Sequence, residues 1–548
     1  MLSLKISDQN VDLSDDFSIT MNLKSPMFGD VGSYSYPFKL PNTPRNASVL
    51  GFRHRVENTT DIYREDKGMF LWNRINLFQG TVTLKTLNSK LFEGSILEGQ
   101  GDFNYQRKKL LLQDINFGEA LWFVNTEEKM AYINACKNTV YPDRAISFPM
   151  IHNKTYFEEP PTDYMLEYFN YYDQSTIYEI NPVTTTTMVI VPMLYVRYVL
   201  KKIFEHLGFV FDDIFFTSSS DFNKLVLYNS VDCNSGVVTP NYFQYPHSAI
   251  GYNFHVPRVS LSDFFTGLES FFNIRFFVNY PTRTVKLISL DTIVKATDFI
   301  DLSTNIISVS TEPEEKKTGY HLSMSMDTDD ETFTAFKEIQ EKFMERIKTP
   351  VQSVAELMAW PLSDYEDIRW VYDEGCYYNL PLTNVWVALT ESYFDDFLYY
   401  ESIYKNKNES IETKFSALMN ESTAPFHAVV GNAMTNWKKS TPKLLFTRYV
   451  DNGYYDRKMV GEHNTGVNNL FYYGTYGLLN KHYKAFFDFC MATKLVKIVK
   501  QMSFQELKEF DFSKKYMIGG TLYLVKSIQV TLKKDRIMPA TLECFTCP

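Results

Sequence analysis

The chain has 548 residues, of which 45% are hydrophobic and 22% charged, with a formal net charge of −10 and a pI near 5.5. This acidic balance argues against binding to a phosphate backbone, which needs a concentrated basic surface, and the length favours several domains over one core. Aromatic residues reach 16%. Because aromatic side chains suit strands and supply large contact areas, we expect a β-rich protein with extensive interfaces.

The first part of the chain, residues 1–112, has the pattern of antiparallel β-structure. Apolar and polar residues alternate in MLSLKIS and DFSITMNLKS, and turn residues such as Gly80 and Gly99 separate later strands. Regularly spaced short strands predict a small barrel or sandwich domain. The start lacks the pattern of a secretory signal, and the most apolar run, from Met188, is too short to span a bilayer. We therefore expect neither export by that route nor membrane insertion.

A proline segment, GSYSYPFKLPNTPRN at residues 32–46, interrupts these strands. Its aromatic and leucine side chains lie at strand spacing, which buries one face and argues against a disordered linker. Pro37 lies between these side chains and so points to the opposite face of the strand. It has no backbone N–H donor, which suits an edge strand or a bulge, and Pro41 and Pro44 then fix a turn. We predict a rigid feature presented to a neighbouring subunit, formed by Tyr34, Tyr36, Pro37, Phe38, Pro41 and Pro44.

Residues 113–165 are acidic and aromatic without clear periodicity, and we interpret them as an insertion or linker region. Residues 166–300 predict an α+β domain. One helix is expected to begin near Pro192 and end at Gly208. A second follows a cap at Ser260 or Ser262 and ends at Asn273, and a hairpin comes after it.

Residues 301–450 form an acidic region of mixed character, and residues 451–548 an α+β segment that closes the inner body. In this last segment Ser503 and Glu506 have the spacing of a capping box, and a hairpin is expected over Gly519 and Gly520. The predicted fold class is therefore α+β and β-rich. It comprises several domains, which are small antiparallel β-barrels or sandwiches plus helix-hairpin units.

Two stretches could hold a metal ion. Cys544 and Cys547 form a Cys-x-x-Cys pair, but a zinc site of that type needs two further ligands at matched spacing, and the sequence has no second pair. The stretch MDTDDETFTAFKE places Asp327, Asp329, Glu331 and Glu338 at ligand positions of a calcium loop, yet Thr332 stands where the sharp turn requires glycine. We predict no metal site and no cofactor.

A catalytic site is equally unsupported by the pattern. Acidic pairs such as Glu158-Glu159 and Asp395-Asp396 could serve a glycosidase, but sequence alone does not place two carboxylates across a sugar. The nine histidines are scattered, with no HExxH arrangement and no GxSxG serine. No nucleotide-binding glycine motif occurs. We therefore predict a protein that is not an enzyme and has no catalytic residues.

Three stretches resemble tail-tip proteins of phages and prophages from Bacteroidetes bacteria. They are YSYPFKLPNTPRNASVLGF, SDFFTGLESFFNIRFFVNYPTRTVKLISL and SFQELKEFDFSKKYMIGGTLYLVKSIQVTL. More distantly, the layout is similar to the baseplate hub proteins of phage tails. That resemblance implies two barrel-like domains similar to tail-tube subunits, in a trimer whose pseudo-sixfold ring joins the tube to the tip. It leaves 113–165 and 301–450 poorly matched.

The resemblance implies a structural component of a phage tail, a hub or tail-tip protein in the virion, assembled in the host cytoplasm. The expected partners are further copies of the chain in a trimer or other ring, tail-tube subunits and other baseplate proteins, with DNA passing through without specific binding. Two alternatives remain open. One is a tail-associated enzyme that cuts peptidoglycan or surface polysaccharide, and the other is a carbohydrate-binding adhesin marked by exposed aromatic rows.

Overall fold

A computed structural model of the chain describes all residues except 30–34, 56–64, 88–89, 99, 154–162, 181–184, 234–248, 280–281, 312, 314–316, 326–337, 339–340, 361–366, 381–384, 390–399, 419–426, 431–432, 438–440 and 452–456. The described residues form a β-rich α+β fold with curled sheets and several small sheets, which confirms the predicted class. None of the described helices combines the length and apolar composition that a membrane span requires.

The N-terminal sheet has six strands in the order β2-β1-β5-β6-β7-β4. Buried and exposed residues alternate along its strands, because one pleated face packs on the core. At one edge, β4 pairs with β7 and with no other described strand. The strands are β1 (Leu2–Ile6), β2 (Gln9–Asn10), β4 (Ser35–Pro41), β5 (Asp66–Trp72), β6 (Ile75–Leu87) and β7 (Leu91–Glu98).

The C-terminal sheet has the order β20-β34-β35-β36-β33-β21 and takes a further strand, β3, from the N-terminal part of the chain. β3 pairs antiparallel with the second half of β35, from Ser18 opposite Lys533 to Lys24 opposite Ser527. The hairpin of β34 and β35 turns over Gly519 and Gly520, both at positive φ, as predicted. The strands are β3 (Ser18–Lys24), β20 (Phe299–Asp301), β21 (Ile306–Thr311), β33 (Leu495–Lys500), β34 (Lys515–Ile518), β35 (Thr521–Lys533) and β36 (Ala540–Thr546).

The C-terminal sheet must curl, because its two outermost strands are consecutive in the chain. In a flat sheet, the five spacings between β20 and β21 would separate them by about 24 Å. The link from Asp301 to Ile306 spans at most about 18 Å when fully extended. Hydrogen bonds hold this link to the strands beside it, from Leu302 N to the Met517 carbonyl and from Gln501 N to the Asn305 carbonyl. The sheet therefore bends until its edges approach each other.

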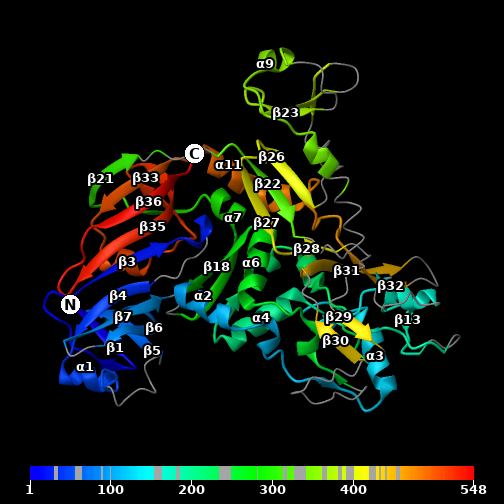
Figure 1. Ribbon diagram of the computed structural model, residues 1–548, viewed down its shortest axis with the longest axis horizontal. Coiled ribbons are helices and arrows are strands. Elements are labelled where there is room, and N and C mark those ends of the chain that lie inside the picture. Colours follow the sequence, from blue (N-terminus) through cyan, green and yellow to red (C-terminus); the bar gives the residue numbers. More distant parts are fainter. Residues whose placement is uncertain are drawn as a thin grey trace.

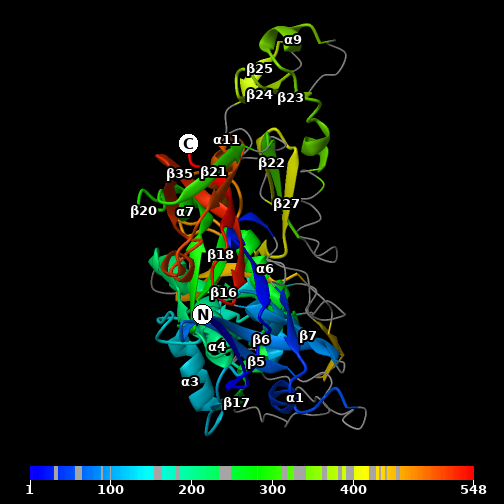
Figure 2. The ribbon, with the colours of Figure 1, turned by 90° about the vertical axis from the view of Figure 1, so that its left-hand side faces the viewer.

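The two curled sheets share one hydrophobic core, and we call the pair the β-body. Buried Leu4, Phe70 and Phe78 from the N-terminal sheet belong to the same cluster as Ile528 and Leu542 from the C-terminal sheet. Figure 1 shows the blue and red strands stacked on one side of the molecule, with both chain ends there, and Figure 2 shows the same stack from the side. The first and the last parts of the chain thus fold together.

A second, larger core lies among the helices in the middle of the chain. On α4 (Val196–His206) the buried stripe is Val196, Val199, Leu200, Ile203 and Phe204. This helix begins four residues later than predicted, because Met193 and Leu194 extend instead and pair with Ser147 and Ile146. The other helices are α2 (Gln100–Lys109), α3 (Thr126–Cys136), α5 (Ile214–Thr217), α6 (Leu261–Phe272), α7 (Leu290–Lys295) and α11 (Lys484–Ala492).

Local sequence signals explain the limits of α6. The Ser260 hydroxyl accepts a hydrogen bond from Asp263 N, and Asn273 adopts the left-handed conformation at φ 50°, as predicted. The hairpin that follows, β18 (Ile274–Asn279) with β19 (Thr284–Ser289), pairs in register, and β15 (Val210–Asp212) runs parallel to β19. The Arg275 guanidinium donates from Nε to the Pro26 carbonyl and so ties this unit to the β-body.

Smaller sheets complete the fold. The largest joins β31 (Lys443–Asp451) to β16 (Leu225–Leu227), β28 (Ser416–Ala417) and β32 (Arg457–Glu462), and another orders β26 (Glu401–Lys405), β22 (Gly319–Met324) and β27 (Glu409–Thr413). The sheet of β23 (Ile368–Val371), β24 (Cys376–Asn379) and β25 (Val387–Leu389) projects with α9 (Val354–Met358) at the top of Figures 1 and 2. Short elements are α1 (Pro44–Val49), α12 (Phe504–Lys508), β8 (Leu121–Trp122), β9 (Ile146–Ser147), β10 (Ile151–His152), β11 (Tyr168–Phe169), β12 (Tyr172–Asp173), β13 (Thr176–Ile177), β14 (Met193–Leu194), β17 (Ala249–Ile250), β29 (His427–Val430) and β30 (Ala433–Trp437).

The predicted division at residues 112, 165, 300 and 450 stays a prediction. The structure adds two connections across those positions. β3 lies within 1–112 but pairs with β35 in 451–548, and β21 lies within 301–450 but pairs with β33.

Candidate functional site

The proline segment forms β4 and the turn after it. Tyr36, Phe38 and Leu40 are buried at 2%, 3% and 1% exposure, whereas Pro37 and Lys39 point to solvent. The predicted strand spacing and the edge position are therefore present, while Tyr34 lies outside the described residues. Because Tyr36 and Phe38 fill the core of their own subunit, their side chains are not available to a neighbour.

Side-chain hydrogen bonds fix the turn after β4. Pro44 is the first residue of α1, behind the cap Thr43, whose hydroxyl accepts from Asn46 N. The buried Asn46 amide donates to the carbonyls of Pro41 and Asp12. Pro37 and Pro41 lack backbone N–H donors, so β4 and its turn present a rigid strand edge that cannot donate at these two positions. We call this feature the proline-guarded edge.

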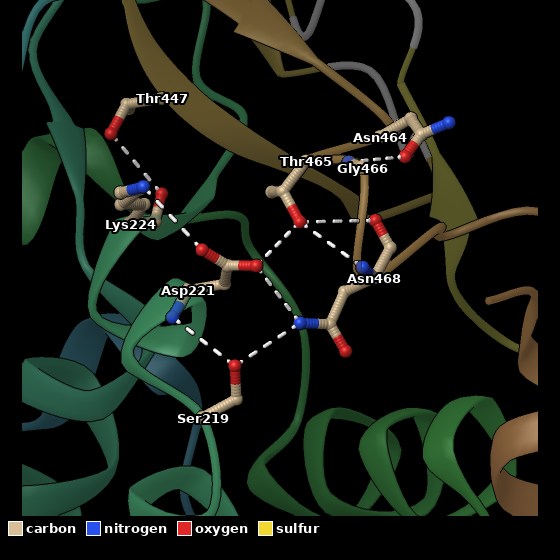
Figure 3. Close-up of polar contacts among 8 residues, drawn as sticks. All are labelled: Ser219, Asp221, Lys224, Thr447, Asn464, Thr465, Gly466 and Asn468. Carbon is tan, nitrogen blue, oxygen red and sulfur yellow. Dashed lines mark hydrogen bonds and ion pairs between the residues drawn. The ribbon is translucent and has the colours of Figure 1, made fainter.

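A polar cluster in the second core, drawn in Figure 3, joins two distant segments of the chain through side-chain hydrogen bonds, and we call it the structural lock. Asp221, 7% exposed, accepts hydrogen bonds at Oδ2 from the Thr465 hydroxyl at 2.5 Å and from Asn468 Nδ2 at 3.0 Å. Its Oδ1 lies 3.4 Å from Lys224 Nζ. Ser219 accepts from both Asp221 N and Asn468 Nδ2. The cluster joins segments about 245 positions apart in the chain.

The chemistry of the cluster opposes a catalytic role for Asp221. Burial raises the pKa of its carboxyl, but the hydrogen bonds from Thr465 and Asn468 and the charge of Lys224 outweigh burial and hold that pKa below its usual value. A carboxylate with a lowered pKa is a weak base for activating the Thr465 hydroxyl. The same hydroxyl also accepts a hydrogen bond from Asn468 N, so it already acts both as a donor and as an acceptor. No motif in the sequence identified this cluster.

Two cavities are described. The larger, about 390 Å³, opens on the outer face of the C-terminal sheet and is lined by Lys24, Lys497 and Lys526 with Glu543 and uncharged polar side chains. The smaller, about 320 Å³, lies between α3 and the segment that begins at β13, with Glu127 and Glu179 in its lining. The buried ammonium of Lys129 donates to Glu179 at 2.9 Å. The polar cluster of Asp221 borders neither cavity.

The possible metal ligands do not come together in the described part of the chain. Cys544 is buried in the β-body core and Cys547 packs on a smaller apolar cluster, and burial raises the pKa of both thiols. Among the described residues, no three or more His, Cys, Asp or Glu side chains cluster. Asp327, Asp329 and Glu331, of the tested calcium loop, lie outside the described residues, as do Glu158-Glu159 and Asp395-Asp396.

Three histidines are packed inside the second core. Burial lowers the pKa of His255 and His482 to about 3 and that of His463 to about 4, so all three are neutral near pH 7. Asn229 Nδ2 lies 3.0 Å from His255 Nδ1. These residues act as core side chains.

Comparison with known proteins gives no family assignment. No protein-family model matches the sequence, and no curated protein matches it. Among solved structures, the 43 kDa tail protein of prophage MuSo2 from Shewanella oneidensis has 7% identity and a TM-score of 0.32, covering 99% of this chain and 95% of its own. The tail protein from Neisseria meningitidis MC58 has 7% identity and a TM-score of 0.33 over the same shares. A likeness this distant transfers no residue roles.

Proposed function

We propose that this chain is a structural component of a phage tail, a hub or tail-tip protein that forms a ring between tail tube and tip. One observation carries the proposal. The first and third of the stretches that resemble tail-tip proteins fold into one body, as β4 of the N-terminal sheet and as β34 and β35 of the C-terminal sheet. The middle stretch forms α6, β18 and β19, which Arg275 ties to that body.

In this proposal the β-body is the tube-like part, and the partners are further copies of the chain, tail-tube subunits and other baseplate proteins. The predicted parts 113–165 and 301–450 are then additions around the inner body. DNA passes through the ring without specific binding. The protein acts in the virion after assembly in the host cytoplasm.

The proline-guarded edge is proposed to face a neighbouring subunit through Pro37, Lys39 and Pro44, the side chains that point outward. Replacing Pro37 and Pro41 with alanine should weaken ring or tube contacts more than monomer folding, because the buried residues of β4 are unchanged. Pro539→Ala, an exposed proline between β35 and β36, is the matched control.

The test is the mass of the purified protein, alone and mixed with tail-tube subunits, measured by light scattering after gel filtration. A ring or a tube-capping complex is expected. A monomer that does not bind the tube subunits would contradict the proposal. If the variant with alanine at positions 37 and 41 assembles normally, the proline segment serves only to shape the fold.

A hydrolase remains the second candidate, because two carboxylates, Glu127 and Glu179, line the smaller cavity. Changing both to glutamine and measuring release of reducing ends from peptidoglycan or surface polysaccharide tests it. Cleavage by the parent protein that the double variant lacks would favour the enzyme.

A further inference from the structure

The larger cavity, on the outer face of the C-terminal sheet, has a basic lining in an acidic protein. Its volume of about 390 Å³ is within the usual range of small-molecule sites. The described residues that line it include three lysines and one glutamate, a formal charge of +2, whereas the whole chain carries −10. Uncharged side chains that form hydrogen bonds, such as Asn22, Gln529 and Thr541, also line it. This composition suits a ligand that is anionic and presents oxygen atoms.

The strand register brings two of the lysines to the cavity from opposite sides. Lys24 of β3 lies opposite Ser527 of β35. Ser527 lies opposite Glu543 of β36, and Glu543 lies opposite Lys497 of β33. These four residues therefore form one row across four strands, whose ends are about 14 Å apart at the usual spacing of neighbouring strands. Both end lysines line the cavity, so a ligand in it lies between two cationic side chains.

A β-bulge in β35 adds the third lysine. The pairing of β35 with β36 shifts between Val525 and Ser527, so Lys526 is the extra residue. By strict alternation Lys526 would share the inner face of the sheet with buried Ile528. The bulge instead places Lys526 beside Ser527 in the lining of the cavity. Bulges of this kind redirect side chains and are frequent beside functional sites.

Contacts within the lining already show how it receives an oxygen anion. The Ser527 hydroxyl donates a hydrogen bond to Glu543 Oε2 at 3.0 Å, and Lys526 Nζ lies 3.8 Å from the same oxygen. A hydroxyl and an ammonium group thus converge on one carboxylate oxygen. The pair of Lys526 and Glu543 is neutral as a unit. The net positive charge of the lining therefore comes from Lys24 and Lys497.

We propose that this cavity binds a small polyanion through phosphate or carboxylate oxygens. Lys24 and Lys497 hold the anion from its two sides, and the Gln529 amide between them donates a further hydrogen bond. The chemistry of recognition is the same for both kinds of oxygen, because ammonium groups bind either as point charges. The site does not rest on the proposed tail function, since a single copy of the chain supplies all of its residues.

Calorimetric titration of the purified protein at pH 7 and low salt tests the site. Sodium citrate and sodium pyrophosphate are the two probes, and they separate carboxylate from phosphate recognition. At least one of them should bind once per chain. Lys497→Gln should raise the dissociation constant at least about tenfold, because it removes a charged hydrogen-bond donor. Lys533→Gln is the matched control on the same face of β35, opposite Ser18 and outside the lining, and it should bind as the parent does.

Four outcomes overturn the proposal. A parent that binds neither anion has no such site, and equal weakening by Lys497→Gln and Lys533→Gln indicates unspecific attraction to the surface. Lys497→Arg keeps the charge and should bind within about threefold of the parent; a loss as large as that of Lys497→Gln shows that the charge is not what binds. A mixed-sequence DNA duplex that displaces the anion identifies a phosphate backbone as the ligand. Lys497→Gln that loses the anion but still binds tube subunits, measured as above, supports the cavity site independently of the tail function.

Discussion

Asp221 gives the sharpest prediction about stability. We expect Asp221→Asn to loosen the junction between residues 219–224 and residues 464–469, because the side chain keeps its size but loses its charge. Two hydrogen bonds to a charged acceptor are affected, from Thr465 at 2.5 Å and from Asn468 at 3.0 Å. Lys224 is 41% exposed and adds little.

The magnitude follows from the difference between charged and neutral hydrogen bonds. A buried bond to a charged group contributes about 1.5–3 kcal/mol and a neutral one about 0.5–1.5 kcal/mol, so two such changes cost about 2–3 kcal/mol. This corresponds to protection factors that are about 30- to 160-fold lower. Hydrogen exchange followed by mass spectrometry on peptides covering 219–227 and 463–471 measures this locally, which suits a chain with several domains.

The pH dependence has a definite sign. The pKa of Asp221 in the folded protein is lowered, so its contribution is fully present above the unfolded value near 3.9 and is lost as pH falls through the folded pKa. The difference between parent and variant should therefore shrink below about pH 4. Asp298→Asn, which removes an exposed pair with Lys514, should leave protection unchanged. Equal protection in parent and Asp221→Asn at pH 7 would refute the assignment of this cluster as a lock.

Three further outcomes are expected. Asp66→Asn should destabilise the β-body by about 3–5 kcal/mol in urea unfolding, because it removes the carboxylate charge that lies 2.6 Å from the buried guanidinium of Arg53; an unchanged midpoint would contradict this. Gly267→Ala should cost about 1–3 kcal/mol, since the added methyl group meets the buried ring of Phe415, and a raised melting temperature would show that the ring moves aside. Burial lowers the pKa of His482 to about 3, so its neutral form favours folding above the unfolded value near 6.5, and its contribution to stability should fall by about 1.4 kcal/mol per pH unit between about pH 6.5 and 3. Urea unfolding of His482→Gln over this range should show a slope smaller by that amount, because the slope contributed by His255 and His463 remains; an unchanged slope would contradict this.

Local signals predicted the elements whose limits depend on near neighbours. The cap at Ser260, the left-handed Asn273 and the capping box of Ser503 and Glu506 were all predictable from spacing and are all present. In each of these the partners lie within a few residues, so the sequence pattern contains the interaction itself. The burial of Tyr36 and Phe38 followed from period 2 in the same way.

Long-range pairing was not predictable from one sequence. The alternation in β3 is equally compatible with any neighbouring strand, and its partner β35 lies more than five hundred residues away. The cluster of Asp221, Thr465 and Asn468 likewise depends on loops that meet only after folding. Alternation also predicted that one face of β4 is buried, without showing that this face packs on the core of its own subunit and not on a neighbour.

The pairing of β3 with β35 has a consequence for how the protein is made. Thr20 and Thr531, which contact each other at 2.9 Å, are 511 positions apart. At about 5–20 residues per second, a ribosome needs roughly 25–100 s to make the intervening chain. Throughout that time the buried face of β3, with Ile19 and Met21, has no sheet to join. Completion of the β-body therefore waits until β35 has been made, and a chain that stops before residue 499 would leave the buried face of β3 without its partner strand.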